Sequence, residues 1–417
     1  MVGTMTSTVT SGPVRERPGD ATRHTDASAL RLALFTDSFV PQLNGVALLL
    51  GRLVEAVRAR GAHVRVYTTS DPGGAEDIDV RRWPSVAFWA YPEHRLALPT
   101  QPRVRRELRA WQPTLVHAAS PFGMGLAARA AARALGVPFV TSYHTNWSEY
   151  SRFYQMGALR GTAWRYLRWF HNGGARTYCP THAVERELAA RGFRHMALWS
   201  RGVDSTRFNP SFRSAALRAS LGVANDTVLA IYVGRLGAEK GVGVALEGMH
   251  EVMRAAPGRV QCAIAGDGPY AEEARRVAPP GTIFMGRLTG DALSEFYASG
   301  DLFMFPSTTD TFGNVLLEAM ASGLPVVGAD VGPTRELLAE HTGVTFAPVD
   351  AGAFARRVLE LVADPGRRAA LGRNALRFAR QCTWDRVWDA LVDDYLLAIS
   401  DQRSAIRNCQ PQTAHSR

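Results

Sequence analysis

The stretch "TVLAIYVGRLGAEKGV" (residues 227–242) contains the pattern that decides the fold. Its apolar first half, 227–234, predicts a buried strand. The glycine-containing turn that follows leads into an apolar helical pattern beginning near Gly241. A strand, a tight turn and a helix in this order form the repeating unit of parallel α/β proteins.

The same unit recurs from residue 31 to about residue 380. We predict strands at 31–36, 64–69, 114–118, 138–143 and 175–179, and again at 227–234, 260–266, 282–286, 302–307 and 325–330. Helical patterns separate them, for example at 45–61, which ends at a glycine suited to a helix C-terminus. We therefore expect an α/β fold with two tandem, doubly wound, Rossmann-like domains. Each has a crevice at the carboxyl ends of its strands.

The polar, glycine- and proline-containing stretch 200–211 separates the two domains. We predict a disordered arm at 1–29, an N-terminal domain at 30–202, a C-terminal domain at 203–383, an amphipathic helix at 384–399 and a tail at 400–417. The polar arm lacks the apolar region of a secretory signal, and no apolar run is long enough to predict a membrane span. The four cysteines are too scattered to predict a zinc site or a disulfide framework.

Positive charge is concentrated in the first half of the chain. Residues 1–200 hold 25 arginines against 14 acidic residues, whereas the remainder is nearly neutral. In the stretches 81–111 and 152–170 the arginines mix with tryptophan and tyrosine, which suits an anionic membrane surface. A solvated helix face is the alternative. Nucleic-acid binding is a further alternative, but no recognition-helix or RNA-binding motif supports it, so we expect no nucleic-acid partner.

The lone lysine of the chain, Lys240, lies just before the helix that starts near Gly241. Arg235 follows Gly234 at the end of the preceding strand. Two cations at a helix N-terminus, where backbone amides already favour negative charge, suit a diphosphate. A compact ammonium reaches a single phosphate oxygen in a way that a planar guanidinium imitates poorly. No G-x-G-x-x-G motif follows either first strand, which disfavours a dinucleotide oxidoreductase.

The stretch "PSTTDTFGNVLLEAMASGLPVV" (306–327) places two acids around the start of a helix. Phe312, Gly313 and Asn314 would present backbone amides to an anion there. Glu318, one turn into the helix, would reach hydroxyl groups in the same pocket. Asp310 precedes the helix and is a second site candidate, although a helix-capping role is the alternative.

Other loops supply weaker candidates. Asn44 and Gly45 open the first long helix, where amides can approach a ligand. His144, in "SYHTNWSEY" (142–150), leaves a strand toward the opposite crevice. Gly266 and Gly268 in "AGDGP" (265–269) form a tight turn or allow a nucleobase or ribose to approach the backbone. The D-x-D pattern at residues 77 and 79 is interpreted as solvated charge, so we expect no metal site.

Together these motifs resemble retaining GT-B glycosyltransferases of family 4, in particular bacterial GDP-mannose-dependent α-mannosyltransferases of glycolipid synthesis. The resemblance covers about residues 31–395 and implies a last helix that crosses back to the first domain. It implies that Arg235 and Lys240 hold the donor diphosphate, with help from the amides at 312–314. Glu318 would hold the ribose, while Asp310, where the family usually has glutamate, and His144 would contact the sugar. Asn44 and Gly45 would lie beside donor and acceptor.

The function implied by the resemblance is hexose transfer, most simply of mannose from GDP-mannose, to a lipid-linked acceptor with retention of configuration. The enzyme would need no metal or cofactor and would act in the cytoplasm, on the inner face of the membrane. A UDP-sugar-dependent glycolipid transferase is the alternative. Glycogen phosphorylases share the two-domain shape but need a pyridoxal-bearing lysine late in the chain. The lone Lys240 lies instead at the phosphate turn. The paired acids argue against a nucleotide-sugar 2-epimerase.

Overall fold

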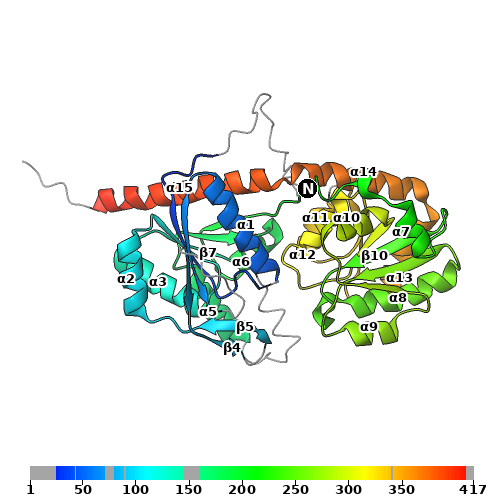
Figure 1. The fold of residues 1–417 in the computed structure, drawn as a ribbon, viewed down its shortest axis with the longest axis horizontal. Coiled ribbons are helices and arrows are strands. Elements are labelled where there is room, and N and C mark those ends of the chain that lie inside the picture. Colours follow the sequence, from blue (N-terminus) through cyan, green and yellow to red (C-terminus); the bar gives the residue numbers. More distant parts are fainter. Residues whose placement is uncertain are drawn as a thin grey trace, which may run out of the picture.

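The computed structural model describes residues 25–42, 44–70, 79–88, 91–144, 160–339 and 341–409, which form two α/β domains side by side (Figure 1). The first domain contains a seven-stranded sheet in the order β3-β2-β1-β6-β7-β8-β9, in which every pairing is parallel. Its strands are β1 (Arg31–Phe35), β2 (His63–Thr69), β3 (Val80–Trp83), β6 (Leu115–Ala118), β7 (Phe139–Ser142), β8 (Arg176–Cys179) and β9 (Met196–Leu198). β4 (Ser85–Phe88) and β5 (Tyr91–Ala97) pair antiparallel beside it.

Helices cover both faces of this sheet, as a doubly wound fold requires. They are α1 (Gly45–Ala59), α2 (Gln101–Trp111), α3 (Gly123–Leu135), α5 (Arg160–His171) and α6 (His182–Ala190). Apolar residues of α1 build the core on one face, and those of α2 and α3 build it on the other. The chain moves outward from β1 to β3 and returns to β6, so β1 and β6 flank the point where the strand order reverses.

The second domain repeats the design with a six-stranded parallel sheet in the order β12-β11-β10-β13-β14-β15. Its strands are β10 (Val228–Val233), β11 (Val260–Ala265), β12 (Ile283–Gly286), β13 (Leu302–Phe305), β14 (Val326–Ala329) and β15 (Gly343–Phe346). Its helices are α7 (Ala215–Ser220), α8 (Val242–Ala255), α9 (Ala271–Val277), α10 (Gly290–Ser299), α11 (Asn314–Ala321), α12 (Gly332–Leu338), α13 (Ala351–Ala363) and α14 (Pro365–Gln381), with 3-10 turns η2 (Pro210–Phe212) and η3 (Ala238–Lys240). Here β10 and β13 flank the reversal.

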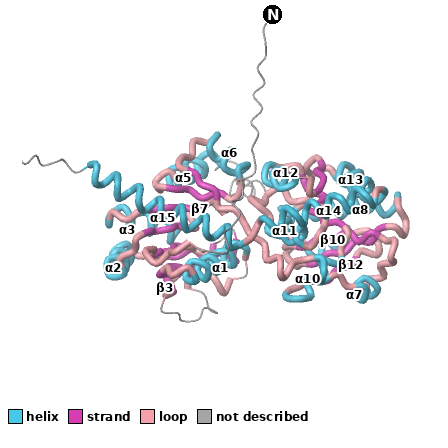
Figure 2. Tube along the Cα trace, turned by 90° about the horizontal axis from the view of Figure 1, so that it is seen from above, coloured by secondary structure: helices cyan, strands magenta, loops and turns pink. Residues whose placement is uncertain are grey.

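The last helix, α15 (Trp384–Cys409), leaves the second domain and lies along the first, where Figures 1 and 2 both show it. Its apolar residues Trp388, Leu391, Val392 and Tyr395 complete the core on the α1 face. Ion pairs of Asp389 with Arg60, at 2.7 Å, and of Asp401 with Arg176, at 2.9 Å, fasten its polar side. The helix continues through 400–409, a stretch that the sequence pattern predicted as tail.

The ten predicted strands are all present, each within one or two residues of its predicted bounds. Pattern analysis missed β3, β4, β5, β9 and β15, which lie at the edges of the main sheets or outside them. Part of the predicted arm at 1–29 is packed against the first domain. Ala27 is fully buried in the first domain, and its amide donates to the carbonyl of Arg60.

The two crossings between the domains lie against each other. Val203, on the first crossing, forms a parallel bridge with Thr383, on the second. A Cβ atom at Gly202 would lie 2.5 Å from the backbone nitrogen of Trp384, so only glycine permits this approach. The domains are thus joined at one place by two packed segments.

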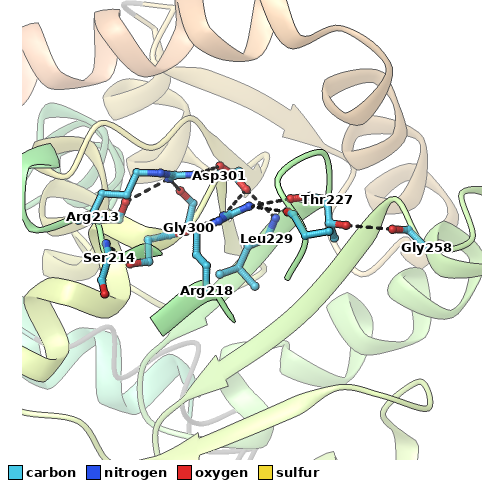
Figure 3. Close-up of polar contacts among 11 residues, drawn as sticks. Arg213, Ser214, Arg218, Thr227, Leu229, Gly258, Gly300 and Asp301 are labelled. Carbon is cyan, nitrogen blue, oxygen red and sulfur yellow. Dashed lines mark hydrogen bonds and ion pairs between the residues drawn. The ribbon is translucent and has the colours of Figure 1, made fainter. Parts of the chain in front are cut away.

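A polar cluster secures the other end of the second sheet (Figure 3). The Asp301 carboxylate accepts from Arg213, Arg218 and the amide of Leu229, each at 2.8 Å. Asp301 precedes β13 and Leu229 is the second residue of β10, so this cluster lies at the amino ends of the strands, away from their carboxyl ends. Among the described residues, every helix is too short or too polar to span a lipid bilayer.

Candidate active site

Two loops meet at the strand-order reversal of the second domain. One follows β10 and ends at Gly241, and the other follows β13 and begins at Pro306. Gly241 adopts φ +68°, and a Cβ atom there would lie 2.5 Å from the Pro306 carbonyl oxygen. Glycine therefore allows the two loops to touch. This contact brings Lys240 beside Asp310, from two stretches that are 70 residues apart.

Lys240 and Asp310 form an ion pair where these two loops meet. The Nζ atom donates to Oδ1 of Asp310 at 2.7 Å, and the side chains are only 19% and 24% exposed. Burial opposes the charged form of Asp310, but the Lys240 ammonium outweighs it, and the pKa of Asp310 lies below its ordinary value. The alternative role of Asp310 as a helix cap is not observed, since Gly313 occupies the N-cap of α11.

Arg235 lies on the same loop and forms an ion pair with Glu239. Its Nη1 atom lies 3.4 Å from Oε1 of Glu239, a carboxylate that is almost completely buried. The Arg235 carbonyl accepts from the hydroxyl of Tyr232 at 3.1 Å. The guanidinium therefore offsets a buried negative charge and remains about one-third exposed toward the crevice.

The N-terminus of α11 carries the other predicted anion contacts. Phe312 is buried, Asn314 is exposed, and Gly313 between them adopts φ +83°. Gly313, the N-cap residue, has no side chain with which to cap the helix. The first-turn amides of α11 are thus available to a ligand at the same crevice.

Glu318 points from α11 to a fully buried tyrosine. The hydroxyl of Tyr297, on α10, donates to Oε2 of Glu318 at 2.9 Å. Burial raises the pKa of Glu318, while the Tyr297 hydrogen bond and the charges of Arg52 and Arg207 act in the opposite direction. Arg52 belongs to α1 of the first domain, so positive charge from both sides of the interdomain boundary acts on this carboxylate.

The predicted glycines of the donor loops have a packing role. A Cβ atom at Gly266 would lie 1.9 Å from the carbonyl oxygen of Gly234, and one at Gly268 would lie 2.4 Å from that of Leu236. The loop after β11 therefore lies directly on the loop after β10. This geometry favours the tight-turn interpretation of "AGDGP", because the backbone that approaches these glycines belongs to the protein.

His144 follows β7 of the first domain and faces the second. Its backbone oxygen accepts from the hydroxyl of Thr311 at 3.1 Å, next to Asp310 in the chain. On the ring, Arg201 donates to Nδ1 at 3.3 Å, and Nε2 lies 2.7 Å from the Ser142 hydroxyl. Burial, and then the charge of Arg201, hold the pKa of His144 well below 6.5, so the ring is neutral at physiological pH. Residues 145–150 of the motif lie outside the described residues.

A cavity of about 110 Å³ opens beside His144 at the carboxyl ends of β1 and β6. Its walls are largely apolar, with Val46, Leu96, Phe122, Tyr143 and Leu167 among them. Asp37 lies in the wall, where its carboxylate accepts from Ser120 and from the amides of residues 97 and 124. Burial raises the pKa of Asp37 although these hydrogen bonds oppose the shift. The cavity therefore suits a mostly apolar ligand.

Asn44 and Gly45 lie at the edge of the same region. The Asn44 side chain caps α1 by accepting from the amide of Ala47 at 2.9 Å, and its amide group donates to Ser38 at 2.8 Å. A Cβ atom at Gly45 would meet nothing within 4 Å. Asn44 is thus a structural cap, whereas Gly45 faces open space.

No cluster of three or more histidine, cysteine or acidic side chains suited to a metal ion occurs in the described part of the chain. Of the D-x-D pair, residue 77 lies outside the described residues. Asp79 pairs with Arg58 at 3.2 Å and is 40% exposed, as the interpretation of surface charge predicts.

Comparison with known proteins identifies the two domains. The profile of Glycosyltransferase Family 4 matches residues 43–207, and that of Glycosyl transferases group 1 matches residues 227–364. A GDP-mannose-dependent alpha-mannosyltransferase of Corynebacterium glutamicum is 32% identical, with 89% of this chain and 91% of the relative covered. The chain belongs to glycosyltransferase family 4.

Other family members differ in their named activities. A sulfoquinovosyl transferase of Arabidopsis thaliana is 35% identical over 85% of this chain and 71% of the relative. An alpha-monoglucosyldiacylglycerol synthase of Streptococcus pneumoniae is 28% identical over 72% and 70%. The HepE protein of Anabaena, solved with UDP, superposes with a TM-score of 0.71 at 21% identity, covering 88% of this chain and 100% of that one. The protein is a glycosyltransferase with the GT-B fold, as the sequence motifs predicted.

Sequence analysis of this glycosyltransferase missed several residues around the site. Thr311, Tyr297 and Arg201 contact its predicted residues through single side-chain hydrogen bonds. Tyr297 occurs in an ordinary helical pattern and Arg201 in the interdomain link, so neither carries a motif. Thr311 lies within the quoted 306–327 stretch, where its place beside Asp310 was the one available signal.

Proposed function

We propose that this enzyme transfers mannose from GDP-mannose to a lipid-linked acceptor, with retention of configuration at the transferred carbon and without a metal ion. The observation that carries the proposal is the Lys240–Asp310 pair in the donor crevice, opposite His144 and its apolar cavity. The named activity of the Corynebacterium relative, which aligns over most of both chains, supports the choice of donor.

Lys240, Arg235 and the amides at the start of α11 are proposed to bind the donor diphosphate. Lys240 is already paired with Asp310, and this pairing offsets part of the free-energy cost of removing the ammonium from water. An incoming phosphate would share the same ammonium. The exposed part of Arg235 and the uncapped amides add donors on the same side. Positive groups at these positions would replace the divalent ion that other nucleotide-sugar enzymes use.

Glu318 is proposed to accept hydrogen bonds from the ribose hydroxyls. Tyr297 holds its carboxylate from behind, which leaves acceptor capacity for a ligand. Asp310 and His144 are proposed to contact the sugar, because Thr311 links the His144 backbone to the residue after Asp310. The reaction would break the bond from the anomeric carbon to the diphosphate oxygen and form one to the acceptor oxygen on the same face. The acceptor proton would pass to the leaving diphosphate.

The acceptor proposal rests on the cavity and on helix α5. Leu167 of α5 lines the cavity, while Arg165, Arg168 and Trp169 of the same helix are exposed. A helix that borders an apolar pocket on one side and presents arginine and tryptophan on the other suits the headgroup region of an anionic membrane. Membrane docking at the cytoplasmic face would then bring a lipid-linked acceptor directly to the cavity. The diacylglycerol product named for the Streptococcus relative supports this choice.

A UDP-sugar is the alternative donor, because the Anabaena structure holds UDP in the same fold. The test is thermal stabilisation by GDP, UDP and ADP, followed by transfer from the matching nucleotide sugars to lipid acceptors. A ligand at 100 times its Kd stabilises the folded state by about 2.7 kcal/mol, which is readily measured. Stabilisation by GDP, transfer of mannose in EDTA and an α-configured product support the proposal. Selective stabilisation by UDP would replace GDP-mannose with a UDP-sugar.

A further inference from the structure

A chain of buried hydrogen bonds connects the C-terminal helix to the histidine of the candidate site. The hydroxyl of Tyr395, on α15, lies 2.7 Å from Nδ1 of His117, on β6. Nε2 of His117 lies 2.9 Å from the hydroxyl of Ser142, on β7. The same hydroxyl lies 2.7 Å from Nε2 of His144. Tyr395 and His117 are fully buried and Ser142 is nearly so.

The direction of the hydrogen bonds at His144 follows from the cation at one end. A guanidinium can only donate, so Nδ1 of His144 accepts from Arg201 and carries no proton. The neutral ring of His144 therefore holds its proton on Nε2 and donates it to the Ser142 oxygen. That hydroxyl also hydrogen-bonds to Nε2 of His117, and Nδ1 of His117 hydrogen-bonds to the Tyr395 hydroxyl. Arg201 thus sets the tautomer of His144, and the chain from Ser142 to Tyr395 fixes the acceptor of its Nε2 proton.

The surroundings keep this chain uncharged. His117 lies within 6 Å, centroid to centroid, of the rings of Tyr178, Trp199 and Tyr395. Burial lowers the pKa of His117 to about 3. Burial also lowers the pKa of Arg201 to about 9, so its guanidinium stays protonated at neutral pH and continues to donate. Neither ring nitrogen of His144 has a proton or lone pair left for acid–base work.

This chain of hydrogen bonds contacts the second domain through the backbone of His144. The Thr311 hydroxyl donates to that backbone oxygen, one residue from Asp310. At the far end, α15 is held on the first domain by the Arg60–Asp389 and Arg176–Asp401 ion pairs. Helix α15 begins at the interdomain crossing. It is connected to the domain boundary at a second place by the hydrogen bonds that lead from Tyr395 to His144.

We propose that Tyr395, His117 and Ser142 are positioning residues, which fix the orientation of the His144 ring, whose tautomer Arg201 sets, so that residue 144 presents a constant surface to the loop after β13. On this view the ring of His144 is an anchor rather than an acid or base. The proposal rests on the proposed function only for the place of His144 beside the sugar; the hydrogen-bond chain itself is independent of the donor identity.

The test compares Tyr395→Phe with Tyr178→Phe. Both tyrosines are buried, and their rings contact each other at 5.6 Å. The Tyr178 hydroxyl donates to Asp394 of α15 at 2.7 Å, but Tyr178 does not belong to the chain of hydrogen bonds that ends at His144. Both variants remove one buried hydroxyl at the α15 interface. Only Tyr395→Phe should lower kcat, by about five- to tenfold, the size expected for one neutral hydrogen bond, with donor KM nearly constant.

Nitrogen-15 NMR of histidine-labelled protein supplies a readout that needs no turnover. The wild type should show His144 protonated on Nε2 and His117 in one neutral tautomer. Tyr395→Phe removes the partner of Nδ1 of His117, so the His117 signals should shift and those of His144 should follow. In Tyr178→Phe both sets of signals should match the wild type. An unchanged His144 signal in Tyr395→Phe, or equal losses of kcat in the two variants, would overturn the proposal.

Ser142→Ala provides a second variant in the middle of the chain. Ser142 lines the cavity, so a replacement of similar size leaves the packing intact. Ser142→Ala should lower kcat like Tyr395→Phe, and Ser142→Thr, which keeps the hydroxyl, should recover most of the loss. Equal activity of the alanine and threonine variants would contradict the positioning role. If the wild type transfers no sugar at all, the proposed function fails while the tautomer measurement still decides the hydrogen-bond chain.

Discussion

Replacement of Lys240 by alanine should lower kcat/KM by about 100-fold or more. The Nζ atom lies in the crevice 2.7 Å from Asp310, and its side chain is mostly shielded from water. Negative charge grows on the leaving diphosphate as the sugar departs, so an ammonium at this place stabilises the transition state more than the bound donor. Loss of one such contact typically costs about 3 kcal/mol.

The same variant should change the pH dependence. In the wild type Lys240 holds the pKa of Asp310 below its ordinary value against the effect of burial. Without the ammonium, burial is the largest remaining influence on the pKa of Asp310 and raises it, so the carboxylate should protonate at a higher pH. A depressed carboxyl pKa contributes stability that is full above the unfolded-state pKa and is lost as the pH falls through the folded-state pKa; the variant lacks this contribution. Because the Asp310 carboxylate protonates at a higher pH in Lys240→Ala, the acid limb of the rate profile should move upward in pH.

Lys240→Arg tests shape separately from charge. We expect arginine to recover little activity, because the longer planar guanidinium cannot occupy the position of Nζ beside Asp310. The lone lysine also permits reductive methylation with a carbon-13 label, which leaves the charge in place and adds an NMR probe beside Asp310. The donor should shift that signal on binding.

The assay is sugar transfer measured from initial rates over pH 4.5–8.5, with circular dichroism as the folding control. Arg276→Ala is the matched control variant, because it removes one positive charge from an exposed ion pair on α9. It should behave like the wild type. Near-normal turnover of Lys240→Ala would remove Lys240 from the donor site, and near-normal turnover of Lys240→Arg would refute the argument from shape.

Three further predictions concern the membrane, the second domain and pH. Arg165→Glu combined with Arg168→Glu should weaken binding to anionic liposomes by about 1 kcal/mol per charge while donor hydrolysis in solution survives; unchanged sedimentation with liposomes would contradict membrane docking. Asp301→Asn leaves the buried cation of Arg218 uncompensated and should lower the free energy of unfolding by about 3–5 kcal/mol, measured by urea denaturation; a loss below 1 kcal/mol would show that the cluster is dispensable. Burial lowers the pKa of His171 to about 3, so below pH 6.5 the unfolded chain binds a proton that the native state does not bind. Stability should fall by about 1.4 kcal/mol per pH unit for each such histidine as the pH drops below 6.5, and His171→Gln should flatten that slope.

The strand and helix pattern was predictable because each buried parallel strand is a continuous apolar run bounded by a turn. The stretches at 227–234 and 302–307 show this most clearly. The edge strand β15 (Gly343–Phe346) was not predictable, since all its residues except Phe346 are only partly buried and need no such run. The extension of α15 through 400–409 was missed because that segment is polar. It is held by tertiary contacts such as the Arg176–Asp401 ion pair.

The loops of the candidate donor site could also be predicted, since Lys240, Asp310 and Glu318 occur in local motifs next to helix starts. Their physical basis is local: a helix N-terminus attracts anions wherever it occurs, and glycine allows backbone to approach. The pairing of Lys240 with Asp310 was not predictable from these motifs. It depends on the adjacency of β10 and β13 and on the contact of Gly241 with Pro306.

Local sequence thus determined the two Rossmann-like domains, the turn that ends at Gly241 and the candidate donor residues, because short-range patterns encode strands, caps and helix termini. Tertiary structure alone decided the state of His144. Burial keeps its ring neutral, and Arg201 from the interdomain link and Ser142 from β7 hydrogen-bond its two nitrogens, while His117 and Tyr395 extend the chain behind Ser142. No local pattern encodes such a chain, since the protonation of a buried ring depends on partners that meet only when distant segments pack together.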